Sequence, residues 1–121
     1  TGHSLGAAMA TVATSRFEEY TPVEQLTTFG SPRVGTRKFV KNIATPHFRF
    51  VNNNDIVTKV PLWLMGYKHH GVLQYINFYG NIRKLTTWQA IKDKWRGYRS
   101  GILDGAMDHG MANYVKHTKD L

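Results

Sequence analysis

The chain has 121 residues, of which 41% are hydrophobic and 12% aromatic, and this size and composition are typical of one globular domain. It contains no cysteine, which excludes disulfides, thiolate metal ligands and cysteine nucleophiles. No apolar run approaches the ~20 residues of a membrane-spanning helix. Residue 1 is a threonine and no signal-peptide pattern is present, so the sequence leaves both a secreted and a cytoplasmic location open.

The chain is strongly basic. It carries 16 lysines and arginines and 8 aspartates and glutamates, which gives a formal net charge of +8. Such a charge suits nucleic acid, an anionic membrane surface or an acidic substrate. The densest basic stretch, residues 92–99, is most simply the solvated face of a helix. Because no helix-turn-helix, zinc or RNA-binding signature accompanies the charge, we expect no nucleic-acid partner.

The first predicted element is a helix over residues 5–19. Small residues fill its first turns, so this helix can lie very close to a neighbouring sheet. Its apolar residues recur at helical spacing and form one stripe, which Phe17 extends: Leu5, Ala8, Met9, Val12 and Ala13. A short strand over residues 25–29 follows and is closed by Gly30-Ser31-Pro32.

The middle of the chain predicts a helix and a second strand. Residues 36–43 have the spacing of a short helix with Thr36 as its N-cap. Residues 47–51 form the next predicted strand, and the turn-forming residues 52–55 come directly after it.

The rest of the chain predicts a hairpin and two helices. Residues 72–79 and 82–85 are two extended segments joined at Gly80-Asn81. A long amphipathic helix is expected over residues 87–103, and a short one over residues 111–115. The alternation of strands and helices favours an α/β fold with a mostly parallel sheet, flanking helices and a hairpin.

A catalytic motif lies at the start of the chain. Gly2-His3-Ser4-Leu5-Gly6 matches the G-x-S-x-G nucleophile elbow, in which a serine on a strained turn between strand and helix is pushed out above the sheet. Gly2 and Gly6 are expected to let the two backbones approach. The following helix points its N-terminus at the same place. We therefore predict Ser4 as a nucleophile and the backbone N–H of Leu5 as an oxyanion donor.

A serine nucleophile needs a general base and a carboxylate that orients this base. In the elbow fold these follow in the order Asp or Glu, then His. Asp55 is the best acid because it follows a predicted strand, where α/β sheets place active-site residues. His109, in a glycine-flanked loop before the last helix, is the best base. The alternative is that Asp55 is only a turn residue in an asparagine-rich loop.

The other histidines are interpreted as surface residues or polar core residues: His3, His47, His69, His70 and His117. His3 neighbours Ser4 in the sequence but is expected to point away from it on the sharp turn. His69 and His70 do not predict a metal site, because adjacent residues point apart and no further ligands follow at metal spacing.

Five segments in the same order resemble the class 3 lipases, the fungal-lipase-like branch of the α/β-hydrolases. The elbow at residues 1–8 resembles that family's nucleophile motif, and the other segments resemble its later motifs. These are Thr28–Gly35, Arg49–Val57 with Val60-Pro61, Tyr67–Gly71, and Asp108-His109 with Tyr114. Together they run from residue 1 to about residue 115.

The resemblance implies a partial α/β-hydrolase fold, with this chain as the C-terminal portion of a single lipase domain whose N-terminal half is missing. It implies Ser4 as nucleophile, Asp55 as orienting acid and His109 as base. It also implies a carboxylic ester hydrolase that acts on acylglycerol-type lipids through an acyl-enzyme, without metal or organic cofactor. A phospholipase or an aromatic esterase with the same triad fits the resemblance as well.

Several alternatives remain open at this stage. The chain could be a catalytically inactive lipase-like fragment or binding module, whereas the elbow makes Thr1 unlikely as an N-terminal nucleophile. The basic helix at residues 87–103 could contact a lipid–water interface, although packing its aromatic stripe on the core is the simpler interpretation. The oligomeric state is undetermined. A chain with half its scaffold is expected to expose sheet edges and an apolar face.

Overall fold

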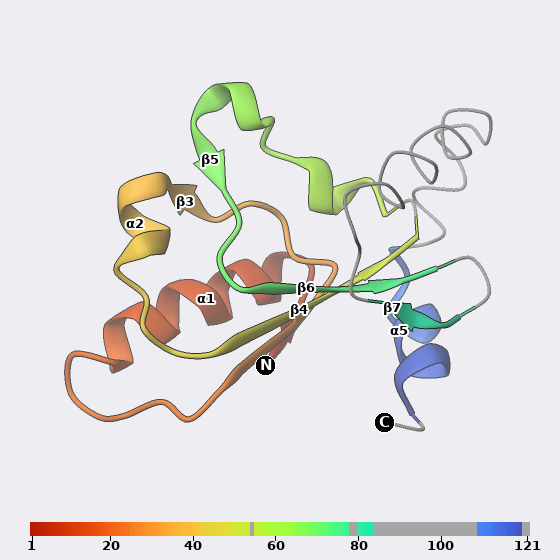
Figure 1. The fold of residues 1–121 in the computed structure, drawn as a ribbon, viewed down its shortest axis with the longest axis horizontal. Helices are drawn as coiled ribbons and strands as arrows, with labels where there is room; N and C mark the ends of the chain where they lie inside the picture. The colour runs from red at the N-terminus through yellow and green to blue at the C-terminus, as the bar shows by residue number, and fades with distance from the viewer. Residues whose placement is uncertain (54, 78–79, 84–108, 120–121) are drawn as a thin grey trace.

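The computed structural model describes residues 1–53, 55–77, 80–83 and 109–119. Its main feature is a sheet whose strands run in the order β1-β2-β4-β6-β7 (Figure 1). The strands are β1 (Gly2–His3), β2 (Leu26–Phe29), β4 (His47–Asn52), β6 (Val72–Ile76) and β7 (Ile82–Arg83). The first four are parallel and β7 is antiparallel to β6. The predicted mostly parallel α/β sheet with a hairpin is therefore confirmed.

The sequence-predicted strands lie within one or two residues of the observed ones at their starts. The strand expected from residue 25 begins at Leu26, and the strand expected from His47 begins there. The first hairpin strand is shorter than expected, since β6 ends at Ile76, whereas the second expected strand extends beyond the described residues. The helix expected at residues 87–103 lies outside the residues that the structure describes.

Helix α1 (Leu5–Phe17) begins where the elbow motif predicts and covers part of the sheet next to β1 and β2 (Figure 1). The apolar stripe is not the buried face of this helix. Ala7, Thr11 and Thr14 are buried, whereas the predicted stripe is largely exposed, with Leu5 70% and Met9 64% accessible. The sheet passes so close to the helix that only small side chains fit between them, which turns the large apolar residues outward.

A small second sheet lies beside the main one. Strand β3 (Gly35–Thr36) pairs antiparallel with β5 (Tyr67–Lys68). Helix α2 (Arg37–Lys41) follows β3, and the Thr36 hydroxyl accepts a hydrogen bond from the Phe39 N–H at 3.3 Å. The predicted N-cap is confirmed, and the helix ends two residues earlier than expected. Two single-turn 3-10 helices, η1 (Val57–Lys59) and η2 (Trp63–Met65), lie between β4 and β5.

The last described element is helix α5 (Met111–Thr118), which is longer than the predicted short helix. Its Tyr114 side chain is fully buried, and α5 contacts β4. Helix α5 therefore lies at the edge of the sheet where β1 and β4 end. None of the helices in the described part of the chain is long and apolar enough to span a membrane.

Candidate active site

Ser4 occupies the turn between β1 and α1. Its backbone angles are φ 56° and ψ −127°, a positive φ that is unusual for a residue with a side chain and is typical of strained functional turns. Its N–H donates to the Phe29 carbonyl at 3.0 Å, which ties the turn to β2. The elbow geometry predicted from the sequence is therefore present.

The two glycines of the elbow differ in what they do. A Cβ on Gly2 would overlap the backbone carbonyl of Gly6, so only glycine fits at Gly2. By contrast, a Cβ on Gly6 would meet no atom within 4 Å in the described residues. The expectation that both glycines permit close backbone approach is therefore correct for Gly2 and wrong for Gly6. The reason is that position 6 of the helix faces away from the strand.

His109 lies between Ser4 and Asp55. Its Nε2 is 2.7 Å from the Ser4 hydroxyl oxygen, and its Nδ1 is 2.9 Å and 3.0 Å from the two carboxylate oxygens of Asp55. A carboxylate accepts only, so Nδ1 carries the proton and Nε2 is free to accept the hydroxyl proton of Ser4. Three residues that are far apart in the sequence thus form one hydrogen-bonded chain, since His109 lies 105 positions after Ser4 and 54 positions after Asp55.

Asp55 is completely buried. Besides His109, its carboxylate accepts the Val57 N–H at 2.9 Å and the Tyr114 hydroxyl at 2.5 Å. The Tyr114 oxygen in turn accepts the Asn52 N–H at 3.0 Å. These donors hold the carboxylate in place without neutralising it, so a negative charge remains behind the imidazole.

A glycine lies against the acid and the base. Gly30, which closes β2, has φ +57°, and its N–H donates to the Phe50 carbonyl at 3.0 Å. A Cβ there would lie 2.8 Å from Oδ2 of Asp55 and 3.0 Å from Nδ1 of His109. Both the backbone angle and the available space therefore require glycine at this position.

His3 packs on the general-base candidate. Its Nε2 donates to the His109 carbonyl at 2.8 Å, and the two rings are stacked with centroids 4.8 Å apart. The edge of the same ring meets Tyr114, with centroids 5.7 Å apart. The sequence prediction addressed only the direction of His3 relative to Ser4 and missed this contact with His109.

The N-terminus of α1 adds hydrogen-bond donors beside Ser4. The first N–H groups of an α-helix have no acceptor within the helix, and the helix dipole makes this end partly positive. Leu5 is the first residue of α1, so its N–H is available to an oxygen that becomes negative next to Ser4.

No metal site accompanies these residues in the described part of the chain, where no group of three or more His, Asp or Glu residues could hold an ion. The adjacent histidines are held apart as expected. His69 donates to the Thr58 carbonyl at 2.9 Å, whereas His70 lies 3.1 Å from Nδ1 of His47. Burial lowers the pKa of His47 to about 4 and that of His69 to about 3, so both are neutral near pH 7.

Comparisons with known proteins agree with this geometry. The family model described as lipase (class 3) matches residues 1–65. The secreted mono- and diacylglycerol lipase A of Penicillium cyclopium is 47% identical over 72 residues, which is 56% of this chain and 23% of that protein. The chloroplastic phospholipase A(1) DAD1 of Arabidopsis thaliana is 45% identical over 67 residues, which is 50% of this chain and 15% of that protein.

Solved structures extend the likeness over most of the chain. A mutant of MDLA from Penicillium cyclopium matches 89% of this chain and 43% of its own, with a TM-score of 0.68 and 32% identity. A triacylglycerol lipase described as having a serine protease triad at its catalytic centre matches 89% of this chain and 44% of its own, with a TM-score of 0.67 and 25% identity. The sheet and its helices are therefore part of an α/β-hydrolase fold. The chain spans less than half the length of each of these relatives.

Proposed function

The chain belongs to the class 3 lipase family, and we propose that it carries the catalytic residues of a serine carboxylic ester hydrolase. One observation carries this proposal: the hydrogen bonds that run from Ser4 through His109 to the buried carboxylate of Asp55. In the proposed roles Ser4 is the nucleophile, His109 the general base and acid, and Asp55 the group that orients His109.

The first half of the proposed reaction forms an acyl-enzyme. The Ser4 oxygen attacks the ester carbonyl carbon while Nε2 of His109 takes the hydroxyl proton. Asp55 stabilises the imidazolium that forms. The tetrahedral intermediate then collapses, the bond from carbon to the alcohol oxygen breaks, and His109 returns the proton to the leaving alcohol.

The oxygen of the former carbonyl becomes negative in the tetrahedral intermediate. The Leu5 N–H at the start of α1 is the proposed donor to this oxygen. One such donor is worth on the order of 10²–10³ in rate in other enzymes. Its backbone origin means that side-chain substitution at position 5 leaves this donor in place.

The second half releases the acid. Water attacks the Ser4 ester while His109 takes one water proton, and collapse of the second intermediate breaks the bond to Ser4 and restores the hydroxyl. The net reaction is ester plus water giving carboxylic acid plus alcohol. Every proton in this cycle moves through His109, so the reaction balances without a metal or organic cofactor.

Acylglycerol-type lipids are the proposed substrates. The Penicillium relative, a secreted mono- and diacylglycerol lipase, supports this class, whereas the Arabidopsis relative, a phospholipase A(1), represents the alternative specificity. A panel with matched acyl chains, containing monoacylglycerol, diacylglycerol, phosphatidylcholine and an aromatic ester, would separate these specificities. Preference for the phospholipid or the aromatic ester would contradict the proposed substrate class and leave the triad roles untouched.

We further propose that the chain is the C-terminal portion of one lipase domain, since 89% of it matches only 43% of the Penicillium MDLA structure. The exposed apolar side of α1 supports this, because Leu5, Met9 and Val12 are all accessible. Packing of further chain on this side would bury a surface that a free domain seldom leaves open.

Covalent labelling tests the catalytic proposal directly. A fluorophosphonate probe is expected to label the protein at Ser4, and mass spectrometry of the labelled peptide identifies the residue. The variants Ser4→Ala and His109→Ala should not be labelled, while a surface variant such as Lys116→Ala should label like the wild type. A folded protein that resists the probe would contradict the enzyme role and favour an inactive binding module.

A further inference from the structure

One histidine of the elbow makes contacts that the proposed reaction does not use. His3 is the last residue of β1 and directly precedes Ser4. Its Nε2 lies 2.8 Å from the carbonyl oxygen of His109, and the two imidazole rings are stacked with an angle of 28° between their planes. A carbonyl oxygen only accepts, so Nε2 of His3 carries a proton and donates this hydrogen bond. One side chain therefore contacts both the main chain and the ring of His109.

The imidazole of His109 needs a third contact to be held in one orientation. Asp55 and Ser4 bind its two nitrogens, and these bonds fix a line across the ring. They restrict the tilt of the ring about that line much less, and a hydrogen bond weakens as donor and acceptor turn out of alignment. A ring stacked on one face restricts this tilt, and the imidazole of His3 occupies that position.

The hydrogen bond from His3 also fixes the main chain of the general base. His109 is followed by Gly110, the N-cap of α5, which makes no side-chain capping bond. The bond from His3 therefore ties the start of α5 to β1 across 106 positions of the sequence. Because Ser4 directly follows His3, the end of one strand positions both the proposed nucleophile and the proposed base.

His3 is itself held from two sides. Its backbone pairs with Phe29 in the parallel ladder between β1 and β2. The edge of its ring meets Tyr114, with an angle of 63° between the two planes, and Tyr114 also donates a hydrogen bond to Asp55. Edge-to-face contacts of this kind are favourable between aromatic rings. His3 thus belongs to a packed group that contacts the acid on one side and the base on the other.

We propose that His3 is a positioning residue that orients His109 through ring stacking and through the hydrogen bond to its main chain. This inference rests on the proposed roles of Ser4 and His109. It replaces the interpretation of His3 as a surface or core residue without a part in the reaction. His3 transfers no proton, so its loss should lower kcat and leave KM little changed.

Three substitutions in the complete enzyme separate the two contacts. His3→Phe keeps a flat ring and removes the donor, whereas His3→Gln keeps an N–H for the carbonyl and removes the ring. Each should lower kcat about 3- to 10-fold, and His3→Ala, which loses both contacts, about 10- to 100-fold, with KM within about twofold of the wild type. A water-soluble substrate such as para-nitrophenyl butyrate keeps lipid binding out of the measurement.

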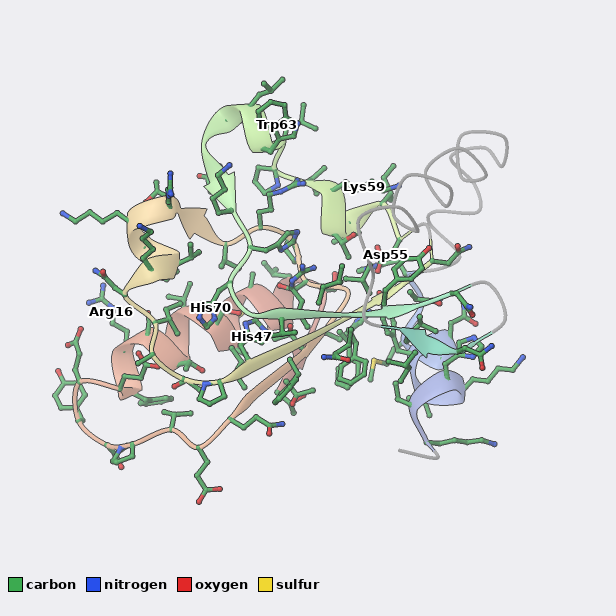
Figure 2. All side chains as sticks on the ribbon, viewed as in Figure 1. Arg16, His47, Asp55, Lys59, Trp63 and His70 are labelled. Atoms are coloured by element: carbon green, nitrogen blue, oxygen red, sulfur yellow. The ribbon has the colours of Figure 1, made fainter. Side chains whose placement is uncertain are left out.

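A second pair of histidines provides the matched control. His70 stacks on His47 with the same angle of 28° between the planes, and its Nε2 faces the Ile43 carbonyl at 3.2 Å. Figure 2 labels this pair near the start of β4, whereas Asp55 lies beyond the other end of the strand. His70→Phe and His70→Gln therefore remove contacts of the same kinds away from the site and should keep kcat within about twofold of the wild type. Thermal melts confirm that each variant is folded.

A spectroscopic readout does not need turnover. The proton between Nδ1 of His109 and Asp55 takes part in a charge-assisted hydrogen bond and gives a strongly deshielded NMR signal. This signal broadens when the ring moves and the proton exchanges with water. Without substrate, His3→Ala should speed the exchange about tenfold or more, whereas His70→Phe should leave it unchanged.

Two results would overturn the proposal. One is a His3→Ala variant whose kcat and His109 proton signal match those of the wild type. The other is a loss of kcat of the same size in the His3 and His70 variants, which would make His3 an ordinary packing residue. A wild-type protein that neither cleaves the ester nor reacts with a fluorophosphonate would instead contradict the proposed function, and the His109 proton signal would still decide the role of His3.

Discussion

Tyr114 donates its hydroxyl proton to Oδ2 of Asp55 at 2.5 Å, and the same hydroxyl oxygen accepts the Asn52 N–H at 3.0 Å. Helix α5 thus reaches into the site from the C-terminal side and fixes the carboxylate from behind. Since the Asp55 carboxylate also accepts a hydrogen bond from Nδ1–H of His109, Tyr114 acts on the imidazole through Asp55. We interpret Tyr114 as a positioning residue.

Tyr114→Phe removes this hydroxyl and keeps the ring. We expect kcat to fall about tenfold with KM little changed, because the acid loses a charge-assisted hydrogen bond and the ester-binding surface does not change. Stability should fall by about 1–3 kcal/mol, since the buried Asn52 N–H loses its acceptor. Steady-state kinetics and thermal unfolding measure the two effects.

Tyr75→Phe is the control for Tyr114→Phe. Tyr75 is 8% exposed, and its hydroxyl donates to Oδ1 of Asn53 at 3.4 Å. Its kcat should remain near the wild-type value. An equal loss of kcat in both variants would indicate a general packing effect and contradict the positioning role.

The elbow glycines give a second prediction. Gly2→Ala forces a methyl group into the Gly6 carbonyl and should prevent folding or lower stability by several kcal/mol, about the cost of displacing packed backbone. Gly6→Ala meets open space inside a helix and should raise stability by up to about 1 kcal/mol. Thermal melts of the two variants measure this contrast, and similar destabilisation in both would contradict it.

Gly30 gives a third prediction that separates strain from contact. Gly30→Ala places a methyl group against Asp55 and His109 and should reduce kcat/KM by on the order of 100-fold, as for other displacements of about 1 Å near reacting groups. Gly66→Ala is the matched control, because its φ of +82° is also positive while its Cβ meets no atom within 4 Å in the described residues. It should share the modest strain cost and keep near-normal activity. Equal activity losses would mean that backbone strain alone is responsible.

Much of the fold was predictable because its signals are local. The elbow motif, the start of α1 at Leu5, the N-cap at Thr36 and the strand from His47 all depend on a few adjacent residues. The spatial proximity of Ser4 and Asp55 was also predictable, because the carboxyl ends of parallel strands meet at one edge of a sheet, whereas His109 follows no strand and was assigned from the chain order of the elbow fold.

The rest depends on contacts that no local pattern encodes. The buried face of α1 is set by how closely the sheet approaches, which selects Thr11 over Met9. Tyr114 and Gly30 contact Asp55 from segments 59 and 25 residues away in the sequence. The apolar run that ends at Met65 has the composition of a core segment, and only the three-dimensional structure reveals that it is exposed.

The buried histidines give a last prediction, on stability against pH. The His70 Nε2 faces the Ile43 carbonyl at 3.2 Å and must carry a proton, so its Nδ1 accepts from Nδ1–H of His47. The Nε2 of His47 then accepts a hydrogen bond from the Thr28 hydroxyl at 2.8 Å. This chain of bonds requires both rings to be neutral, which agrees with burial as the main cause of the lowered pKa of His47 and of His70.

The sign follows from proton linkage. In the unfolded chain a histidine takes up its proton near its ordinary pKa of about 6.5, whereas folded His47 and His69 stay neutral until about pH 4 and about pH 3. The unfolded state therefore binds more protons between these values. Unfolding free energy is fully retained above about pH 6.5 and should fall by up to about 1.4 kcal/mol per histidine for each pH unit below it.

Thermal melts between pH 7.5 and pH 4.5 (roughly the window of this linkage) measure the effect. His69→Gln keeps an N–H that can donate to the Thr58 carbonyl and removes one titrating ring. Its melting temperature should fall less steeply with pH than that of the wild type, while the two should differ little at pH 7.5. Parallel slopes would show that His69 already titrates normally in the folded state, because only a ring held neutral by burial contributes to the linkage.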